Sequence, residues 1–178
     1  MTTPWEVPKL WTGKTVAVLA SGSSLTQELA DSVRNLPCIA VRKAFRRAPW
    51  AEMLVSLDGP LDAVFWEESK DFKGLRICGV ECDMDLLHLA LSHDVIEIAP
   101  GHVIHIRNNG LAAIRIAALA GASKIKLLGF DAAKDGHFTH FYDEFHGGWD
   151  GEEYPGLEIG LAALIAELAA QGIEVERT

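Results

Sequence analysis

The chain has 178 residues, of which 49% are hydrophobic, and this size and composition are typical of one globular domain around a single core. Its formal net charge of −9 disfavours binding to a nucleic acid, because a polyanion binds best to a positive surface. No window has the roughly 18 uncharged apolar residues of a membrane span, and the N-terminal residues lack the apolar segment of a signal peptide. We therefore expect one cytoplasmic domain, residues 1–178, with no membrane partner and with no indication of its oligomeric state.

Short apolar runs rich in Val, Ile and Leu recur along the chain and predict β-strands. These runs are nearly continuous rather than alternating, which is typical of strands that are buried on both faces of a parallel sheet. In chain order they are Thr15–Ala20, Pro37–Val41, Met53–Leu57, Leu75–Val80, Val95–Ala99, Lys124–Phe130 and Ile173–Val175.

Segments of helical length separate many of these strands. The first begins at Ser24-x-x-Gln27, which has the spacing of a capping box, and the alanine-rich one stops at Gly121, a typical left-handed cap. In chain order the predicted helices are Leu25–Leu36, Asp83–Ser92, Leu111–Ala120 and Leu157–Ala170. The alternation of strands and helices predicts a three-layer, Rossmann-like α/β fold with a mostly parallel sheet.

The sequence Ser21-Gly22-Ser23-Ser24 follows the first predicted strand. In an open parallel sheet, ligands bind beyond the carboxyl ends of the strands, where loop amides and helix N-termini face outward. Gly22 would allow a positive φ or the close approach of a ligand, and the serines offer hydroxyl groups, so a phosphate is the natural guest. The alternative is that Gly22 only makes a tight turn and that Ser24 caps the helix.

Two further polar positions follow predicted strands. Asn108, Asn109 and Gly110 open the alanine-rich helix, where capping alone requires only one asparagine. Asp131 follows the strand KIKLLGF and puts a carboxylate at the end of the sheet. We expect this strand to be central and to adjoin the point where the strand order reverses, although Asp131 could also simply cap a turn.

Together these motifs resemble one family group. A strand followed by SGSSL, then NNG with A-x-x-x-A-x-x-x-G-A leading into KIKLLGFD, is similar to the Rossmann-like domain of the family 42 bacterial sialyltransferases, of the motility accessory factor and hydroxymethylpterin pyrophosphokinase-like proteins, and above all of small phage proteins of that group. The resemblance runs from about Val16 to Asp131. It implies that Ser21–Ser24 and Asn108–Gly110 hold the nucleotide of an activated sugar donor. The chain departs from the phage relatives at Arg42-Lys43, where they typically have an Asn-Asp pair.

A basic cluster follows the second predicted strand and comprises Arg42, Lys43, Arg46 and Arg47. If a helical turn starts here, residues four apart share a face. The cluster is either a solvated surface or a phosphate-binding group, in which Arg42 is our candidate. Asp58 follows the next strand, where the resemblance also implies an acid, and it would contact a ribose or sugar hydroxyl or cap a turn.

The segment 131–155 is the one long stretch without an apolar period, and long ordered loops tend to be functional. Its histidines are surface residues, or they act in catalysis, or His137 and His140 hold a metal ion. In the similar sialyltransferases a histidine deprotonates the acceptor and tyrosines assist the departing phosphate, so His140, Tyr142 and Asp131 are our catalytic candidates.

These observations predict a protein that binds a nucleotide or nucleotide-activated sugar and transfers a glycosyl-type group to an acceptor. One alternative is a pyrophosphokinase-like transfer of diphosphate, which requires Mg²⁺ on Asp131 or Asp58. Another is a nucleotide-binding protein without catalysis.

Overall fold

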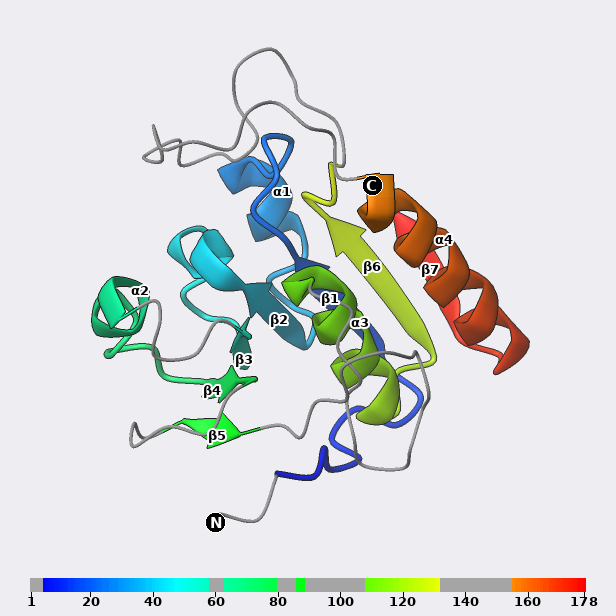
Figure 1. Ribbon diagram of the computed structural model, residues 1–178, viewed down its shortest axis with the longest axis horizontal. Coiled ribbons are helices and arrows are strands. Elements are labelled where there is room, and N and C mark those ends of the chain that lie inside the picture. The colour runs from blue at the N-terminus through cyan, green and yellow to red at the C-terminus, as the bar shows by residue number, and fades with distance from the viewer. Residues whose placement is uncertain (1–4, 58–62, 80–85, 89–107, 132–154) are drawn as a thin grey trace.

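The computed structural model describes residues 5–57, 63–79, 86–88, 108–131 and 155–178. Its centre is an all-parallel sheet in the order β5-β4-β3-β2-β1-β6-β7, in which β5 has only two residues (Figure 1). The strands are β1 Thr15–Leu19, β2 Cys38–Val41, β3 Met53–Ser56, β4 Leu75–Cys78, β5 Leu87–His88, β6 Lys124–Leu128 and β7 Glu174–Arg177. The predicted Rossmann-like α/β fold with a parallel sheet is therefore confirmed.

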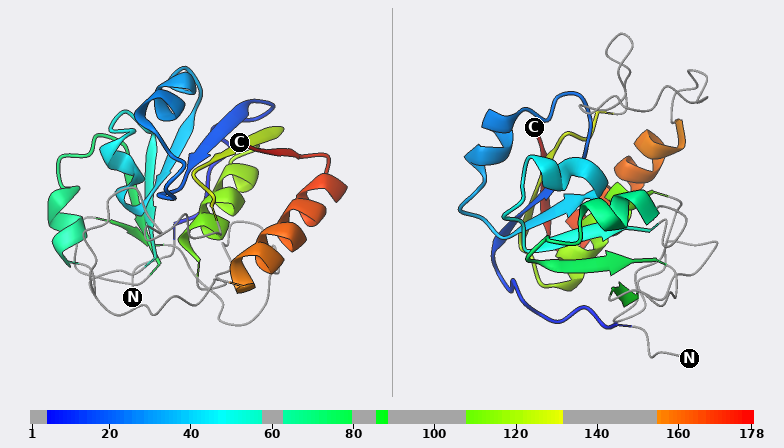
Figure 2. Two further views of the ribbon diagram at one scale, coloured as in Figure 1. Left: turned by 90° about the horizontal axis from the view of Figure 1, so that it is seen from above. Right: turned by 90° about the vertical axis from the view of Figure 1, so that its left-hand side faces the viewer.

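Helices cover both faces of this sheet (Figure 2). They are α1 Gln27–Ser32, the 3-10 helix η1 Arg42–Arg46, α2 Ala63–Glu68, α3 Asn109–Leu119 and α4 Pro155–Ala170. Along β1, Val16 and Val18 pack into the core shared with α3 and α4, whereas Ala17 and Leu19 pack into the core shared with α1, η1 and α2. Successive strand residues point to opposite faces, so continuous apolar runs are what a sheet covered on both sides requires.

Two of the predicted helices differ from the structure. Helix α1 is shorter than predicted, and its N-cap is Thr26, whose hydroxyl accepts from the Leu29 amide at 3.0 Å. The capping box at Ser24 is therefore wrong, because the Ser24 hydroxyl and amide bind elsewhere in the chain. The helix predicted over Asp83–Ser92 is wrong at Leu87–His88, which extend the sheet beside β4.

The other predicted elements within the described residues lie close to their predicted positions, whereas helix α2 was not predicted. Helix α3 begins two residues earlier than expected and ends where Gly121 adopts a φ of +94°. The strand predicted at Val95–Ala99 lies outside the described residues. In the part of the chain that the structure describes, no helix is long and apolar enough to cross a membrane.

Strand β6 is not central, contrary to our expectation. It lies between β1 and the edge strand β7, and its half-buried Lys124 forms ion pairs with Glu174 at 2.7 Å and Glu176 at 2.8 Å on β7. The lysines alternate with Ile125 and Leu127, which face α3 and α4, so only one face of β6 is apolar throughout.

A buried ion pair joins α3 to α4. The side chain of Arg115 is only 5% exposed, and its guanidinium donates two hydrogen bonds to Glu167, at 2.8 and 2.5 Å. These hydrogen bonds hold the pKa of Glu167 below its ordinary value, against the opposing effect of its partial burial. This carboxylate therefore has a structural role.

Candidate functional site

The strand order reverses between β1 and β6. From β1 the chain continues through β2 and β3 on one side, and it later returns to β6 on the other side of β1. In doubly wound sheets, ligands bind in the crevice beyond the carboxyl ends of the strands at such a switch point. Here the two segments that leave this point are Ser21–Ser24 after β1 and Gly129–Asp131 after β6.

These two segments are joined by the Asp131 carboxylate. Its Oδ2 atom accepts from the Ser24 amide at 2.6 Å and from the Ser23 hydroxyl at 3.2 Å, and its Oδ1 atom accepts from the Ser24 hydroxyl. Ser24 is exposed, and Ser23 and Asp131 are half-buried. The sequence therefore folds three donors around one carboxylate that solvent can reach.

Residue 22 must be a glycine because atoms of Gly129 and Asp131 lie very close to it. Its amide donates to the Gly129 carbonyl at 3.0 Å, and a Cβ atom on residue 22 would lie 2.4 Å from that oxygen and 2.6 Å from Asp131 Oδ2. The φ angle of Gly22 lies outside the left-handed region, so space rather than conformation selects glycine here. Both neighbours belong to the chain itself, and a phosphate on the donors of Ser23 and Ser24 would have to displace the Asp131 carboxylate.

The two asparagines at the start of α3 have different partners. Asn108 Oδ1 accepts from the amides of Gly110 at 2.7 Å and Leu111 at 3.1 Å, so Asn108 is the cap. Asn109 Oδ1 accepts from the Leu57 amide at 2.6 Å, which ties α3 to the end of β3. The prediction that capping needs only one asparagine is confirmed, and the second asparagine joins two segments at the carboxyl edge of the sheet.

The start of α3 also lies close to the end of β6. A Cβ atom on Gly110 would lie 2.8 Å from the ring of Phe130, the residue before Asp131. At the same edge, the Arg177 guanidinium donates to the Phe130 carbonyl at 2.5 Å and pairs with Glu158 at 2.9 Å. Arg177 was not among the predicted site residues, although it lies just after the last predicted strand, Ile173–Val175.

Three residues of the basic cluster lie in the 3-10 helix η1, and Arg47 is its C-cap. In a 3-10 helix, side chains three residues apart align, rather than those four apart. Arg42 has a φ of +49°, and its guanidinium carbon lies 5.7 Å from the centre of the Phe65 ring on α2. Arg46 forms a two-pronged ion pair with Glu68, also on α2. At least these two side chains therefore hold η1 against α2, on the far side of β1 from β6.

Several predicted site residues, namely Asp58, His137, His140 and Tyr142, lie outside the described residues. Within the ranges that the structure describes, no group of three histidine, cysteine, aspartate or glutamate side chains could hold a metal ion. The structure thus brings together Ser21–Ser24, Asp131 and, through Phe130, the start of α3.

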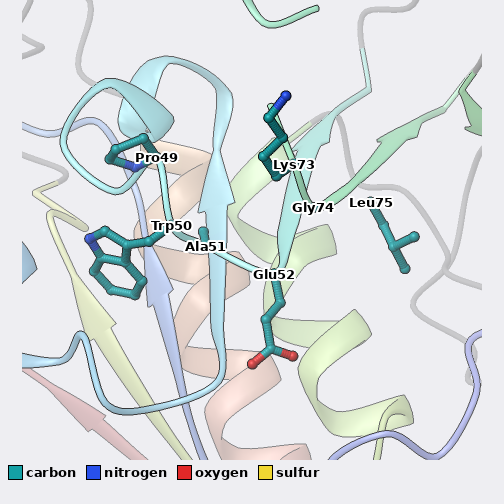
Figure 3. Close-up of a pocket in the computed structure, with 7 residues that line it drawn as sticks. All are labelled: Pro49, Trp50, Ala51, Glu52, Lys73, Gly74 and Leu75. Atoms are coloured by element: carbon teal, nitrogen blue, oxygen red, sulfur yellow. The ribbon is translucent and has the colours of Figure 1, made fainter. Parts of the chain in front are cut away.

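A hollow of about 400 Å³ lies at the opposite, amino edge of the sheet, lined by Pro49, Trp50, Ala51, Glu52, Lys73, Gly74 and Leu75. Its charged side chains diverge: the Glu52 carboxylate and the Lys73 ammonium group point in opposite directions (Figure 3). Glu52 instead accepts from the Trp11 indole at 3.0 Å. A ligand site needs polar groups that converge, so this hollow is not our candidate.

Comparison with protein-family models, with curated proteins and with solved structures finds no match to this chain. What the structure shares with the group named above is the Rossmann-like parallel α/β fold. Function must therefore be argued from the site itself.

Proposed function

We propose that this protein binds a nucleotide or nucleotide-activated sugar at the β1/β6 switch point and transfers a glycosyl-type group from it to an acceptor. The observation that carries the proposal is the Asp131 carboxylate, which Ser23 and Ser24 hold in place at that point. Nucleotides and sugars carry several hydroxyl groups, and a fixed, solvent-accessible carboxylate is a strong acceptor for them.

The phosphate of such a ligand would lie near the start of α3 at the same edge. Helix α3 has eleven residues, and the positive end of its dipole attracts an anion, although the Gly110 and Leu111 amides already donate to Asn108. Because this terminus lies against Phe130, its positive end adjoins the segment that leads to Asp131. A ligand that spans both positions would therefore place an anionic group near α3 and a neutral, hydroxylated group near Asp131.

The transfer step is supported by the sequence that follows Asp131, which contains His140 and Tyr142. In this step the bond between the sugar and the donor phosphate breaks, and the phosphate leaves with the electron pair. The acceptor oxygen forms the new bond to the sugar, and His140 takes the acceptor's proton. An imidazole with an ordinary pKa suits this proton transfer near neutral pH.

A thermal-stability screen tests the binding half of the proposal. The probes are nucleoside mono- and diphosphates and nucleotide sugars, and a ligand present at 100 times its Kd adds about 2.7 kcal/mol to stability. We expect at least one probe to stabilise the wild-type protein. Stabilisation by none of them at millimolar concentration would contradict the proposal.

Two matched serine variants test where the probe binds. Ser24→Ala removes an exposed hydroxyl that donates to Asp131, whereas Ser32→Ala removes an exposed hydroxyl that donates to the Leu29 carbonyl at 2.7 Å. We expect Ser24→Ala alone to weaken binding of the stabilising probe. If the probe binds but His140→Ala leaves turnover unchanged, His140 is not the base. If the wild type turns over no nucleotide sugar, the proposed transfer reaction is wrong.

A further inference from the structure

We infer that Asp131 determines which part of the ligand faces the serine turn: it accepts the ribose hydroxyls and keeps the phosphate away from Ser23 and Ser24. This inference rests on the proposed function and goes beyond it, because it assigns a specificity-determining residue and an orientation to the ligand. It also reverses the expectation from the sequence, which put a phosphate on the turn Ser21–Ser24.

The donors of the serine turn already bind a negatively charged group. The donors that would bind a phosphate oxygen are the Ser24 amide and the hydroxyls of Ser23 and Ser24, and all of them donate to the Asp131 carboxylate. Among the described contacts, no ion pair of Asp131 with a basic side chain offsets its negative charge. A phosphate here would meet an ionised carboxylate and would compete with it for the same donors.

The Asp131 carboxylate has more acceptor positions than the serine turn uses. A carboxylate offers about four acceptor positions, of which the turn uses three, two on Oδ2 and one on Oδ1. Among the described contacts the remaining position is on Oδ1, and the neighbouring Ser24 oxygen, which donates its own hydrogen to Oδ1, also keeps lone pairs. These two oxygens are neighbours, so two donors on adjacent carbons of a ligand can approach them together. The 2′ and 3′ hydroxyls of a ribose therefore match them as paired donors.

The acceptor pair formed by Asp131 Oδ1 and Ser24 Oγ is held in place and accessible. Ser24 is exposed and Asp131 half-buried, so a ligand can reach both. The hydrogen bonds from Ser23 and Ser24 hold the carboxylate in place. A pre-positioned acceptor of this kind loses little freedom when a hydroxyl binds, and this favours discrimination between ligands with and without the hydroxyl.

The test measures binding by titration calorimetry. The probes are the monophosphates of cytidine, uridine, adenosine and guanosine, their 2′,3′-dideoxy forms, and inorganic phosphate. The variants are Asp131→Asn and the matched control Asp31→Asn, which removes the same charge from an exposed aspartate that accepts from Gln27 Nε2 at 3.2 Å. We expect the wild type and Asp31→Asn to bind the ribonucleotide tenfold to a hundredfold more tightly than its dideoxy form. In Asp131→Asn we expect the ribonucleotide to lose at least tenfold, so that the two forms bind alike.

Two results would overturn the inference while leaving the proposed function intact. One is equal binding of ribonucleotide and dideoxynucleotide by the wild type, a comparison that does not depend on how any variant folds. The other is tighter binding of a nucleotide or of inorganic phosphate by Asp131→Asn, which would make the turn a phosphate site that Asp131 blocks. If the wild type binds no nucleotide or nucleotide sugar, the proposed function itself fails.

Discussion

The amino and carboxyl ends of the parallel strands form two opposite edges of the sheet. Each contains a tightly packed glycine and a carboxylate, but the polar side chains are arranged differently. At each edge a glycine lies so close to a backbone carbonyl that a Cβ atom would be 2.4 Å from it: Gly22 against Gly129 at the carboxyl edge, and Gly74 against Glu52 at the amino edge. At each edge a carboxylate also accepts a hydrogen bond from a distant part of the chain.

The difference lies in where the polar groups point. At the amino edge, Glu52 binds the buried Trp11 indole and so fixes the N-terminal segment, while Lys73 points away from it (Figure 3). At the carboxyl edge, three donors converge on Asp131, beside the only reversal of strand order along the described strands. A polar residue at a strand end is therefore not by itself a sign of a site, whereas convergence at an accessible switch point is.

The largest expected effect on stability comes from adding a methyl group at either of the two closely packed glycines. Gly22→Ala and Gly74→Ala should each lower the free energy of unfolding by roughly 2–3 kcal/mol, because a methyl group must be forced against a backbone carbonyl. Urea denaturation measures this cost. Only Gly22→Ala should also weaken binding of the stabilising nucleotide. An equal loss of binding in Gly74→Ala would show that destabilisation, rather than the site, accounts for the effect.

The next largest effect on stability is expected at the ion pair between Arg115 and Glu167. Glu167→Gln should cost about 2 kcal/mol, because it leaves the buried Arg115 guanidinium without its charged partner, although Glu167 is itself one-third exposed. Since the pKa of Glu167 is lowered in the folded state, its contribution is complete above the ordinary glutamate pKa of 4.5 and is lost as the pH falls below that value.

Thermal unfolding of the wild type and Glu167→Gln across this acidic range measures that contribution. The two midpoints should converge as the pH falls through this range. A constant difference between wild type and Glu167→Gln would contradict the ion-pair account.

The smallest effect is expected at the amino edge. Glu52→Ala should cost about 1 kcal/mol, because it leaves the indole of Trp11 without its acceptor. It should leave nucleotide affinity unchanged, since the hollow lies at the opposite edge of the sheet from Asp131. Denaturation and calorimetry on the same sample check both parts, and a loss of affinity would move the site toward this edge.

The strands could be predicted because a strand buried on both faces needs a continuous apolar run in the sequence, such as Val16–Leu19. The start of α1 could not, because the donors of Ser24 are taken by Asp131, 107 residues away. Likewise, Leu87 and His88 pair with β4 at the sheet edge, and tertiary pairing there overrides a local helical pattern.

For the site, too, the positions of the polar residues could be predicted from the sequence, but their contacts could not. Ser21–Ser24 and Asp131 could each be found from the sequence, because each follows an apolar strand. Their contact depends on β6 lying beside β1, and that neighbourhood is set by the packing of the whole sheet rather than by any local pattern. For the same reason, the local sequence pattern predicts a phosphate on the donors of Ser23 and Ser24, which in the folded chain bind the Asp131 carboxylate.

The most direct test of the central claim is a nucleotide titration of ¹⁵N-labelled protein followed by NMR. The four nucleoside monophosphates serve as probes, and the backbone amides and the tryptophan indoles report on both edges at once. We predict saturable shifts at the amides of Gly22, Ser23, Ser24 and Asp131, with the amide of Gly74 and the indoles of Trp11 and Trp50 unmoved. Shifts confined to Gly74 and the two indoles, or no saturable shift with any probe, would contradict a nucleotide site at the β1/β6 switch point.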